Sequence, residues 1–407
     1  MIPFSEALGE VLARVAALER EDVALGSALG RFLACDVKAL SAMPRFDNSS
    51  VDGFGVRVSD LERASSEHPV RLPVAGTVPA GRLWSGSLPQ RTALKLMTGA
   101  PVPPEVEAVV MREDVDEASG AAAFRGPVEH GQNIRRRGGE YGAGALLLRE
   151  GTRLTPPAVA VLASQGMARV SVHGRPRVRL VVTGSELALQ GGLAAAQIYD
   201  SNGWGLEAAV RCLGIEDVRV ATCRDDPGEV RSALAAAIEE GDVVITSGGV
   251  SVGDFDFVPS AFESLGGRRR FWRVAIKPGK PNYFGEWEGA SGRRTFLFGL
   301  PGNPVGALLS FERLVRPALL KLMGARELRP AALQARLTQA IHKAEGRLEF
   351  VRGILANTAE GAEVEPVAAR ESHMLVGLAS ANCLIAFPRD ATRLEAGSLV
   401  DVELLVW

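Results

Sequence analysis

Four segments between residues 174 and 328 have the composition of loops that bind an anion. They are Thr183–Glu186, Ser247–Asp256, Lys277–Pro281 and Gly299–Phe311, which read "TGSE", "SGGVSVGDFD", "KPGKP" and "GLPGNPVGALLSF". Glycine lets a backbone approach a ligand closely, hydroxyls and amides donate hydrogen bonds, and lysine adds positive charge. The segments therefore predict a phosphate or oxyanion site, with these candidate substrate-binding residues: Ser247, Gly248, Gly249, Ser251, Gly253, Lys277, Lys280, Pro301 and Asn303.

Three carboxylates in the same segments are candidate Mg²⁺ ligands: Glu186, Asp254 and Asp256. Mg²⁺ prefers oxygen ligands and usually reaches a phosphate through one or two carboxylates. Structural interpretations stay open for two of these carboxylates and for the two lysines. Asp254 could cap a helix, Glu186 could be stabilised by a helix dipole, and the two lysines could be solvated surface residues.

The stretch "GLPGNPVGALLSF" places rigid residues at the mouth of a helix-like run. Pro301 and Pro304 are expected to fix a turn that directs the amides of Asn303, Val305 and Gly306 into a cleft, where a helix start favours an anion. The two lysines should approach the same place. The alternative is a plain strand-to-helix turn with Pro304 near the first helical position.

A second group of polar residues lies outside this region. The stretch "MPRFDNSSVDGFGVR" contains Asp52, the later loop "MTGAPVPP" contains Thr98, and "NIRRRGGE" contains Arg136. The first stretch is also compatible with a turn rich in aspartate and asparagine, and the arginine run with a solvated surface.

The elements around these residues predict a multidomain α/β plus β protein. From residue 174 to residue 328, apolar strands such as "RVRLVVTG" and "DVVITSGG" alternate with helical runs, including "DPGEVRSALAAAIEEG" with Asp226 as its N-cap. This alternation is typical of a mainly parallel sheet, which binds ligands at the carboxyl ends of its strands.

The remaining segments divide the chain further. We expect helices at Ser5–Arg20 and Leu25–Cys35, short strands in residues 43–132, a helix from Pro156 to about Gly166, and a small β domain after Pro330. The predicted domains are a discontinuous linker domain (1–42 and 133–173), an inserted β-rich domain (43–132), an α/β domain (174–328) and a C-terminal β domain (329–407).

Bulk composition excludes several classes of protein. A length of 407 residues suits several domains, and a net charge of −2 indicates no nucleic-acid-binding patch. Four scattered cysteines without a C-x-x-C pair are typical of a reduced cytoplasmic protein. There is neither a signal peptide nor a run of about 18 uncharged apolar residues, so we expect a cytoplasmic location without membrane contact.

Taken together, the motifs resemble the molybdopterin molybdenumtransferases, the MoeA family, which also includes the E domain of gephyrin. "FDNSSVDGF", "TGAPVP", "NIRRRG", "VVTGSEL", "TSGGVSVGDFD", "KPGKP" and "GLPGNPVGALLSF" occur in that family's order. The resemblance implies insertion of molybdenum from molybdate into adenylylated molybdopterin, with Mg²⁺ as cofactor and release of AMP. It also implies an elongated linker domain, a molybdopterin-binding α/β domain and a C-terminal β-barrel.

The resemblance assigns roles to individual residues and partners. Asp52, Thr98, Glu186 and Asp256 become catalytic candidates, and Arg136 becomes a substrate-binding candidate. The cleft would form in a homodimer, between the α/β domain of one subunit and the inserted domain of the other. Candidate partners are a molybdopterin adenylyltransferase and the molybdoenzymes that receive the product.

Two positions depart from the family pattern. Gly138, Gly139 and Glu140 stand where "GED" is usual, and Ser185 replaces the aspartate of "TGDEL". A molybdopterin adenylyltransferase would share only the α/β portion. The other open alternative is a non-catalytic scaffold or a molybdopterin-binding paralogue.

Overall fold

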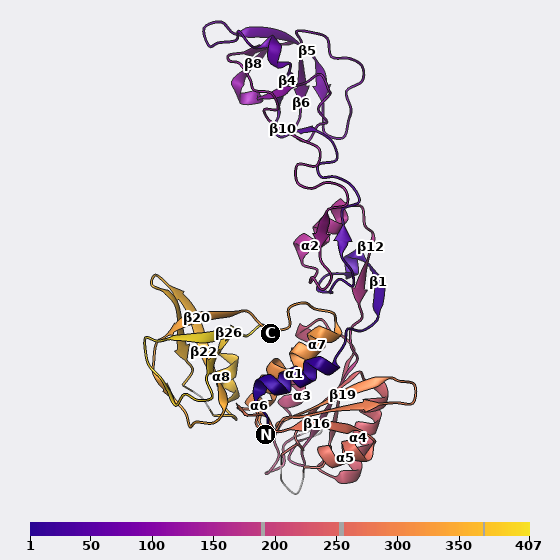
Figure 1. The fold of residues 1–407 in the computed structure, drawn as a ribbon, viewed down its shortest axis with the longest axis vertical. Helices are drawn as coiled ribbons and strands as arrows, with labels where there is room; N and C mark the ends of the chain where they lie inside the picture. Colours follow the sequence, from indigo (N-terminus) through magenta and orange to yellow (C-terminus); the bar gives the residue numbers. More distant parts are fainter. Residues whose placement is uncertain (189–191, 252–255, 369–370) are drawn as a thin grey trace. The chain divides into compact units, whose positions relative to one another are not determined.

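The computed structural model describes residues 1–188, 192–251, 256–368 and 371–407. The chain forms two compact units (Figure 1). The larger unit comprises Met1–Cys35, Glu150–Ala160 and Met167–Trp407, and the smaller unit comprises Asp36–Arg149 and Val161–Gly166. Asp254 and Gly253, which the sequence singles out, lie outside the described residues.

A six-stranded sheet forms the centre of the larger unit, in the order β14-β13-β15-β19-β18-β16. Its strands are β13 (Val178–Thr183), β14 (Val218–Cys223), β15 (Val243–Ser247), β16 (Arg268–Trp272), β18 (Tyr283–Glu288) and β19 (Arg294–Leu300). The first four in spatial order are parallel, and β18 and β16 join antiparallel. The predicted α/β fold with a mainly parallel sheet is confirmed.

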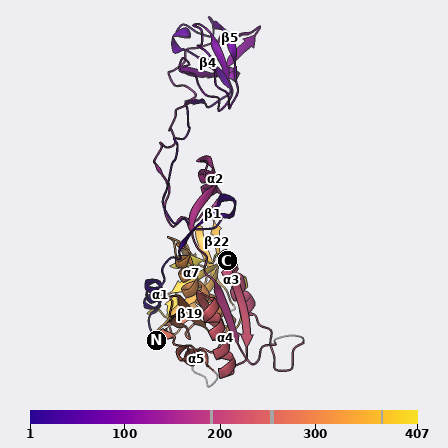
Figure 2. The same cartoon turned by 90° about the vertical axis from the view of Figure 1, so that its right-hand side faces the viewer.

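Helices cover both faces of this sheet (Figure 1). They are α1 (Phe4–Arg14), α3 (Asn202–Cys212), α4 (Pro227–Glu240), α5 (Val258–Ser264), α6 (Pro304–Ser310) and α7 (Arg316–Leu322). One buried cluster joins α1, α3, α6 and α7 to the sheet, and a second joins α4 and α5 to it. The turned view again shows α4 and α5 beside each other (Figure 2).

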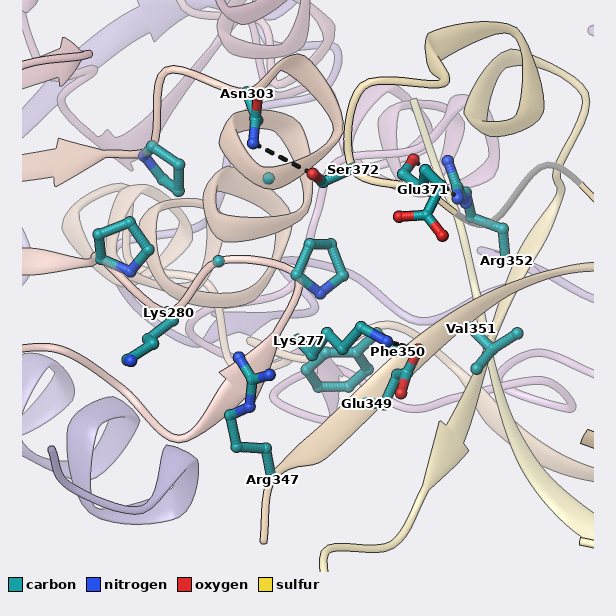
Figure 3. A pocket seen from close by; sticks show the side chains of 15 residues that line it. Lys277, Lys280, Asn303, Arg347, Glu349, Phe350, Val351, Arg352, Glu371 and Ser372 are labelled. Atoms are coloured by element: carbon teal, nitrogen blue, oxygen red, sulfur yellow. Dashed lines mark hydrogen bonds and ion pairs between the residues drawn. The ribbon is translucent and has the colours of Figure 1, made fainter. Parts of the chain in front are cut away.

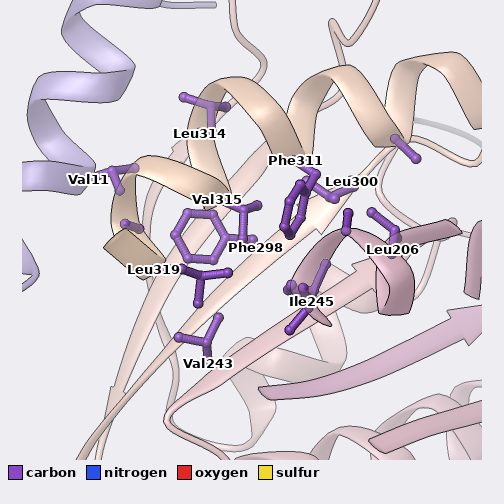
Figure 4. Packing of buried hydrophobic residues seen from close by; sticks show 14 of the residues in the cluster. Val11, Leu206, Val243, Ile245, Phe298, Leu300, Phe311, Leu314, Val315 and Leu319 are labelled. Carbon is purple, nitrogen blue, oxygen red and sulfur yellow. The ribbon is translucent and has the colours of Figure 1, made fainter. Parts of the chain in front are cut away.

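Buried side chains pack between β15, β19 and the α6–α7 segment, and they hold the carboxyl ends of these two strands in place. A π-helical turn, Phe311–Val315, joins α6 to α7. Figure 4 shows Phe311, Val315 and Leu319 against strand residues such as Ile245 and Phe298, and all are fully buried. Because each such side chain contributes about 1.5–3 kcal/mol on burial, this cluster fixes the turn that precedes α6.

The N-terminal segment differs from the sequence prediction. The first helix ends at Arg14, and Leu25–Cys35 is not a helix. Instead, β1 (Arg20–Ala24) pairs antiparallel with β12 (Arg169–His173), and only a short 3₁₀ turn, Leu25–Ser27, follows. Gly30 has φ +77°, which interrupts a helix, and glycine costs about 1 kcal/mol in a helix interior.

The helix predicted at the paired prolines is present. It is α2 (Pro156–Ser164). The N-cap of α4 is also as predicted, because the Asp226 side chain accepts hydrogen bonds from the amides of Gly228 and Glu229, both at 2.9 Å.

The C-terminal region of the larger unit is a closed barrel. Its elements are β20 (Ala332–Leu337), β21 (Ile341–His342), β22 (Leu348–Thr358), β23 (Gly361–Pro366), α8 (Leu375–Ala379), β24 (Cys383–Phe387), β25 (Arg393–Leu394) and β26 (Leu399–Leu404). Strand β24 pairs with both β26 and β22, which closes a ring of five strands. A short strand, β17 (Ile276–Lys277), adds to β22 in parallel. The predicted C-terminal β-barrel is confirmed.

The smaller unit is β-rich, as predicted. Its main sheet has the order β7-β4-β6-β5-β9-β8. The strands of the whole unit, including two short pairs outside this sheet, are β2 (Val37–Lys38), β3 (Asn48–Ser49), β4 (Gly53–Val56), β5 (Val70–Val78), β6 (Ala93–Leu96), β7 (Ala108–Met111), β8 (Val115–Ala118), β9 (Ala121–Phe124), β10 (Ile134–Arg135) and β11 (Leu146–Leu148). Apolar residues including Phe54, Leu72 and Phe124 form its core.

Within the described residues, none of the helices combines the length and the apolar character needed to span a bilayer.

Candidate functional site

Two neighbouring cavities in the larger unit contain most of the predicted site residues, and the turn Pro301–Pro304 contributes residues to both. The carboxylate cavity, of about 230 Å³, is lined by Glu186, Asp200, Asp225 and Asp256 together with the glycines that follow β15. The lysine cavity, of about 270 Å³, is lined by Lys277, Lys280, Arg347 and Arg352 together with Glu349 and Glu371.

This arrangement differs from the single site expected at one sheet edge. Thr183, Glu186 and Gly248 line one cavity, whereas the "KPGKP" segment lines the other. The physical reason is that β17 pairs with β22 of the barrel and not with the α/β sheet. The segment returns to the sheet only at β18, whose first residue, Tyr283, lies opposite Gly299 near the end of β19.

The carboxylate cavity depends on two glycines. Gly248 has φ +90° and Gly249 has φ +66°, conformations that side chains disfavour. A Cβ atom at Gly248 would lie 2.6 Å from the Thr183 carbonyl oxygen. Only glycine allows this loop to pack against the end of β13 and leave the cavity open.

Two of the four carboxylates were not predicted from the sequence. The Asp225 carboxylate accepts a hydrogen bond from the Ser185 amide at 3.0 Å, and the Ser185 hydroxyl accepts one from the Asp225 amide at 3.2 Å. The Asp200 carboxylate accepts one from the Gly203 amide at 2.7 Å. Asp225 lies two residues after the end of β14, so the rule of strand carboxyl ends, applied to every strand, would have found it.

The donor set of this cavity suits Mg²⁺ only together with a ligand's own oxygens. Among the described residues, no three carboxylate, histidine or cysteine side chains lie close enough to hold an ion. The cavity lining nevertheless includes Glu186 and Asp256. Mg²⁺ is usually held by one or two carboxylates plus substrate phosphates, so the residues present fit that mode.

Asn202 connects the two strand ends that form the cavity wall. Its side-chain amide donates to the Ser247 hydroxyl at 2.8 Å and to the Gly302 carbonyl at 2.6 Å. Ser247, predicted to bind substrate, is therefore buried, with its hydroxyl between Asn202 and the Pro301 carbonyl. Within the described residues, Asn202 Oδ1 and Thr183 Oγ1 are buried without a hydrogen-bond partner, and both residues line the cavity. Ser251 is exposed.

The lysine cavity has more positive than negative charge (Figure 3). Four cationic side chains face two carboxylates, an excess of two. Lys277 Nζ lies 3.2 Å from Glu349 Oε1, whereas Lys280 forms no salt bridge with the described residues. Such a cavity matches a small dianion in charge.

Arg347 and Arg352 were missed by sequence reasoning. Arg352 is 3% exposed, and its guanidinium donates to the carbonyls of Met374 at 3.0 Å and Glu371 at 3.3 Å. Both arginines come from β22 or the residue before it, about seventy residues after "KPGKP". Only the β17–β22 pairing brings them together, and no local pattern signals it.

One of the three backbone amides predicted to bind an anion already donates a hydrogen bond within the protein. The Val305 N–H donates to the Ser372 carbonyl at 3.3 Å, so the prediction that it points into an open cleft is wrong. The Asn303 side chain donates to the Ser372 hydroxyl at 3.1 Å. The rigid turn therefore contacts a loop of the barrel region, and Pro301, Asn303 and Gly306 still line the lysine cavity.

In the smaller unit, Asp52 and Thr98 lie together and Arg136 lies with a different carboxylate. Asp52 Oδ1 accepts hydrogen bonds from the Thr98 amide and hydroxyl, both at 2.7 Å. The hydrogen bond from the Thr98 amide is the main cause that lowers the pKa of Asp52, so this exposed group is a carboxylate at neutral pH. Arg136 pairs with Asp47 at 2.7 Å.

Comparison with known proteins decides the family. Three protein-family models match consecutive parts of the chain: the MoeA N-terminal region (domain I and II) at residues 2–166, a probable molybdopterin binding domain at 179–321, and the MoeA C-terminal region (domain IV) at 334–405. The molybdopterin molybdenumtransferase of Haemophilus influenzae is 37% identical over 95% of this chain and 94% of its own. The chain belongs to the molybdopterin molybdenumtransferase (MoeA) family. The resemblance seen in its motifs is confirmed.

Other MoeA-family proteins match over the same extent. Molybdopterin molybdenumtransferase 2 of Mycobacterium tuberculosis is 39% identical over 95% of this chain and 94% of its own. A solved structure of the molybdopterin biosynthesis MoeA protein from Pyrococcus horikoshii matches with a TM-score of 0.80 and 31% identity, covering 99% of both chains. The MoeA-family match thus extends through the inserted and C-terminal regions, beyond the α/β portion alone.

Proposed function

We propose that this chain is a molybdopterin molybdenumtransferase, which inserts molybdenum from molybdate into adenylylated molybdopterin in molybdenum cofactor biosynthesis. The observation that carries the proposal is the pair of cavities on either side of one rigid turn. The lysine cavity has the positive charge that a small oxyanion needs, and the carboxylate cavity has the glycines and carboxylates that suit a phosphate with its metal ion. The named relatives support the same reaction.

The lysine cavity is the proposed molybdate site. Molybdate is a dianion, and the cavity has two more cationic than anionic side chains. Lys280, Arg347 and Lys277 supply the charge. Arg352 donates to two backbone carbonyls, which fix the position of its guanidinium.

The carboxylate cavity is the proposed site for the pyrophosphate of adenylylated molybdopterin. Glu186 and Asp256, with Asp254, would hold Mg²⁺, which when bound polarises the phosphate bond that breaks on AMP release. Gly248 and Gly249 let the backbone approach the phosphates, and Asn202 Oδ1 and Thr183 Oγ1 offer buried polar atoms to the ligand. These groups position and stabilise charge, so the step needs no covalent nucleophile.

The four-domain division and the homodimer are part of the same proposal. Asp52, Thr98 and Arg136 belong to the smaller unit and would complete the cleft of a second copy. The cytoplasm is the proposed compartment, because all four cysteines are free thiols. A molybdopterin adenylyltransferase and apo-molybdoenzymes are the proposed suppliers and recipients.

The test is a reconstituted reaction. Purified protein is incubated with adenylylated molybdopterin, molybdate and Mg²⁺, and AMP and the activation of an apo-molybdoenzyme are measured. We expect both products, and chelation of Mg²⁺ should stop both. Formation of adenylylated molybdopterin from ATP would instead identify an adenylyltransferase, and binding of molybdopterin without turnover would identify a scaffold.

Two adjacent aspartates provide a matched pair of variants. Asp225→Ala removes the acceptor of the Ser185 amide, next to Glu186, and should lower the rate of AMP release by about tenfold or more, as expected for a hydrogen bond to a charged group. Asp226→Ala removes the N-cap of α4 and should lower the unfolding free energy by about 1 kcal/mol with little change in rate. Urea unfolding and initial rates of both variants check this. Equal rate losses would contradict a special role for Asp225.

A complementation experiment tests the shared cleft. Asp52→Ala and Asp256→Ala protomers are each expected to be inactive as homodimers. After random exchange, half of the dimers are mixed and each carries one intact cleft, so about a quarter of wild-type activity should return. A mixture as inactive as its parents, or an active monomer in sedimentation, would contradict the proposal.

A further inference from the structure

A third cavity in the larger unit, here called the arginine cavity, has a volume of about 570 Å³. It is lined by Arg153, Arg316, Arg326 and Arg329, with Glu327 as its single acidic residue among those described. Its described lining has no residue in common with the carboxylate or lysine cavity. It is therefore separate from the machinery proposed for molybdenum transfer.

Three of the four arginines of this cavity form no ion pair within the described parts of the chain. Arg316 pairs with Glu312 at 2.5 Å, but its Nε is buried without a partner. Arg153, Arg326 and Arg329 are exposed and form no side-chain hydrogen bond or ion pair with any described residue. The charges of Arg316 and Arg329 add to burial, the main cause, in lowering the pKa of the neighbouring Arg313 to about 10.

The backbone is shaped to hold one of these arginines in place. The Arg326 amide donates to the Gly151 carbonyl at 3.2 Å, which joins the segment after α7 to the segment before α2. Gly151 has φ +75°, and a Cβ atom there would lie 2.3 Å from Arg326 Cγ. The close approach of the two segments therefore depends on glycine at this position.

We propose that the arginine cavity binds a diphosphate group, either as inorganic pyrophosphate or carried by a small molecule such as a nucleoside diphosphate. Guanidinium groups match phosphate oxygens through paired N–H donors, and like charges gathered without counter-ions repel until an anion binds. The volume lies within the usual range of small-molecule sites. Phe32 and Leu320 add an apolar wall, which the organic part of a molecule carrying the diphosphate would contact.

The experiment measures binding of pyrophosphate and ADP by calorimetry at low salt without Mg²⁺. The full-length chain carries Lys277→Ala and Lys280→Ala, so that the lysine cavity does not contribute. Adding Arg326→Gln and Arg329→Gln should weaken binding at least tenfold, and salt should weaken the parent's binding. Arg231→Gln, at an exposed position of α4, is the matched control and should leave the binding of both anions unchanged. Tighter binding of ADP would identify a carried diphosphate, and tighter binding of pyrophosphate the free anion.

Several results would overturn the proposal. One is an unchanged affinity for pyrophosphate and ADP in the variant with both Arg326→Gln and Arg329→Gln. Another is a shift toward monomer in sedimentation without a change in the affinity for either anion, which would show that the arginines pair with carboxylates of a second copy. Should the combined variant fold poorly by thermal unfolding, Arg326→Gln and Arg329→Gln are measured singly. Each should then show weaker binding, and two unaffected single variants would equally refute the site.

Discussion

Asp256→Ala is expected to lower Mg²⁺-dependent release of AMP by about two to three orders of magnitude, the cost of losing one fixed electrostatic group at a reacting centre. Asp256 lines the carboxylate cavity with Glu186, next to the glycine turn after β15. Glu186→Ala should have an effect of similar size. Because both residues are at least partly exposed, neither replacement leaves a cavity in the core, and the fold should survive.

The measurement is the initial rate of AMP release over a range of Mg²⁺ concentrations, with thermal unfolding to verify the fold. Asp226→Ala is the control, since it changes a carboxylate in the same region that caps α4. A rate that recovers at high Mg²⁺ would indicate weakened metal binding, in agreement with the proposed role. Near-normal turnover in both variants would remove Asp256 and Glu186 from the site.

Lys277→Ala and Lys280→Ala should each raise the molybdate concentration required for half-maximal rate by about tenfold or more, because 1.4 kcal/mol corresponds to a factor of ten. The two replacements differ in mechanism. Lys280→Ala removes a positive charge that forms no salt bridge with the described residues. Lys277→Ala also removes the salt-bridge partner of Glu349, whose side chain is 12% exposed and whose negative charge stays beside the anion.

This difference supplies an internal control. Glu349→Gln in the Lys277→Ala background should restore part of the molybdate response, and in the Lys280→Ala background it should restore less. The apparent affinity for adenylylated molybdopterin should suffer less in all of these variants. A wild-type molybdate response in both lysine variants would show that the "KPGKP" segment is only a turn.

The α/β fold could be predicted from the sequence because its signals are local. Apolar strands such as Val178–Thr183 and Val243–Ser247 are fully buried, and Asp226 caps its helix through its own neighbours. The N-terminal error has a physical cause as well. Ser5–Arg20 and Leu25–Cys35 have helical spacing in the sequence, but the residues between them, Arg20–Ala24, pair with Arg169–His173 of a distant segment.

The candidate site was predictable only in part, for the same reason. Gly248, Glu186 and Asp256 follow strands and could be found by a rule about strand ends. Arg352 and Ser372 reach the lysine cavity through barrel pairings, and no short motif marks them. The division into two cavities follows from the pairing of Lys277 with Glu349, which the sequence alone does not reveal.

The most direct test of the account is a single-turnover experiment that counts molybdenum and AMP together. Enzyme in excess over adenylylated molybdopterin is mixed with molybdate and Mg²⁺, and AMP and pterin-bound molybdenum are quantified over time. The account predicts that both form at the same rate and in equal amounts, and that omission of molybdate suppresses both. AMP release at full rate without molybdate, or AMP without molybdenum in the product, would contradict it.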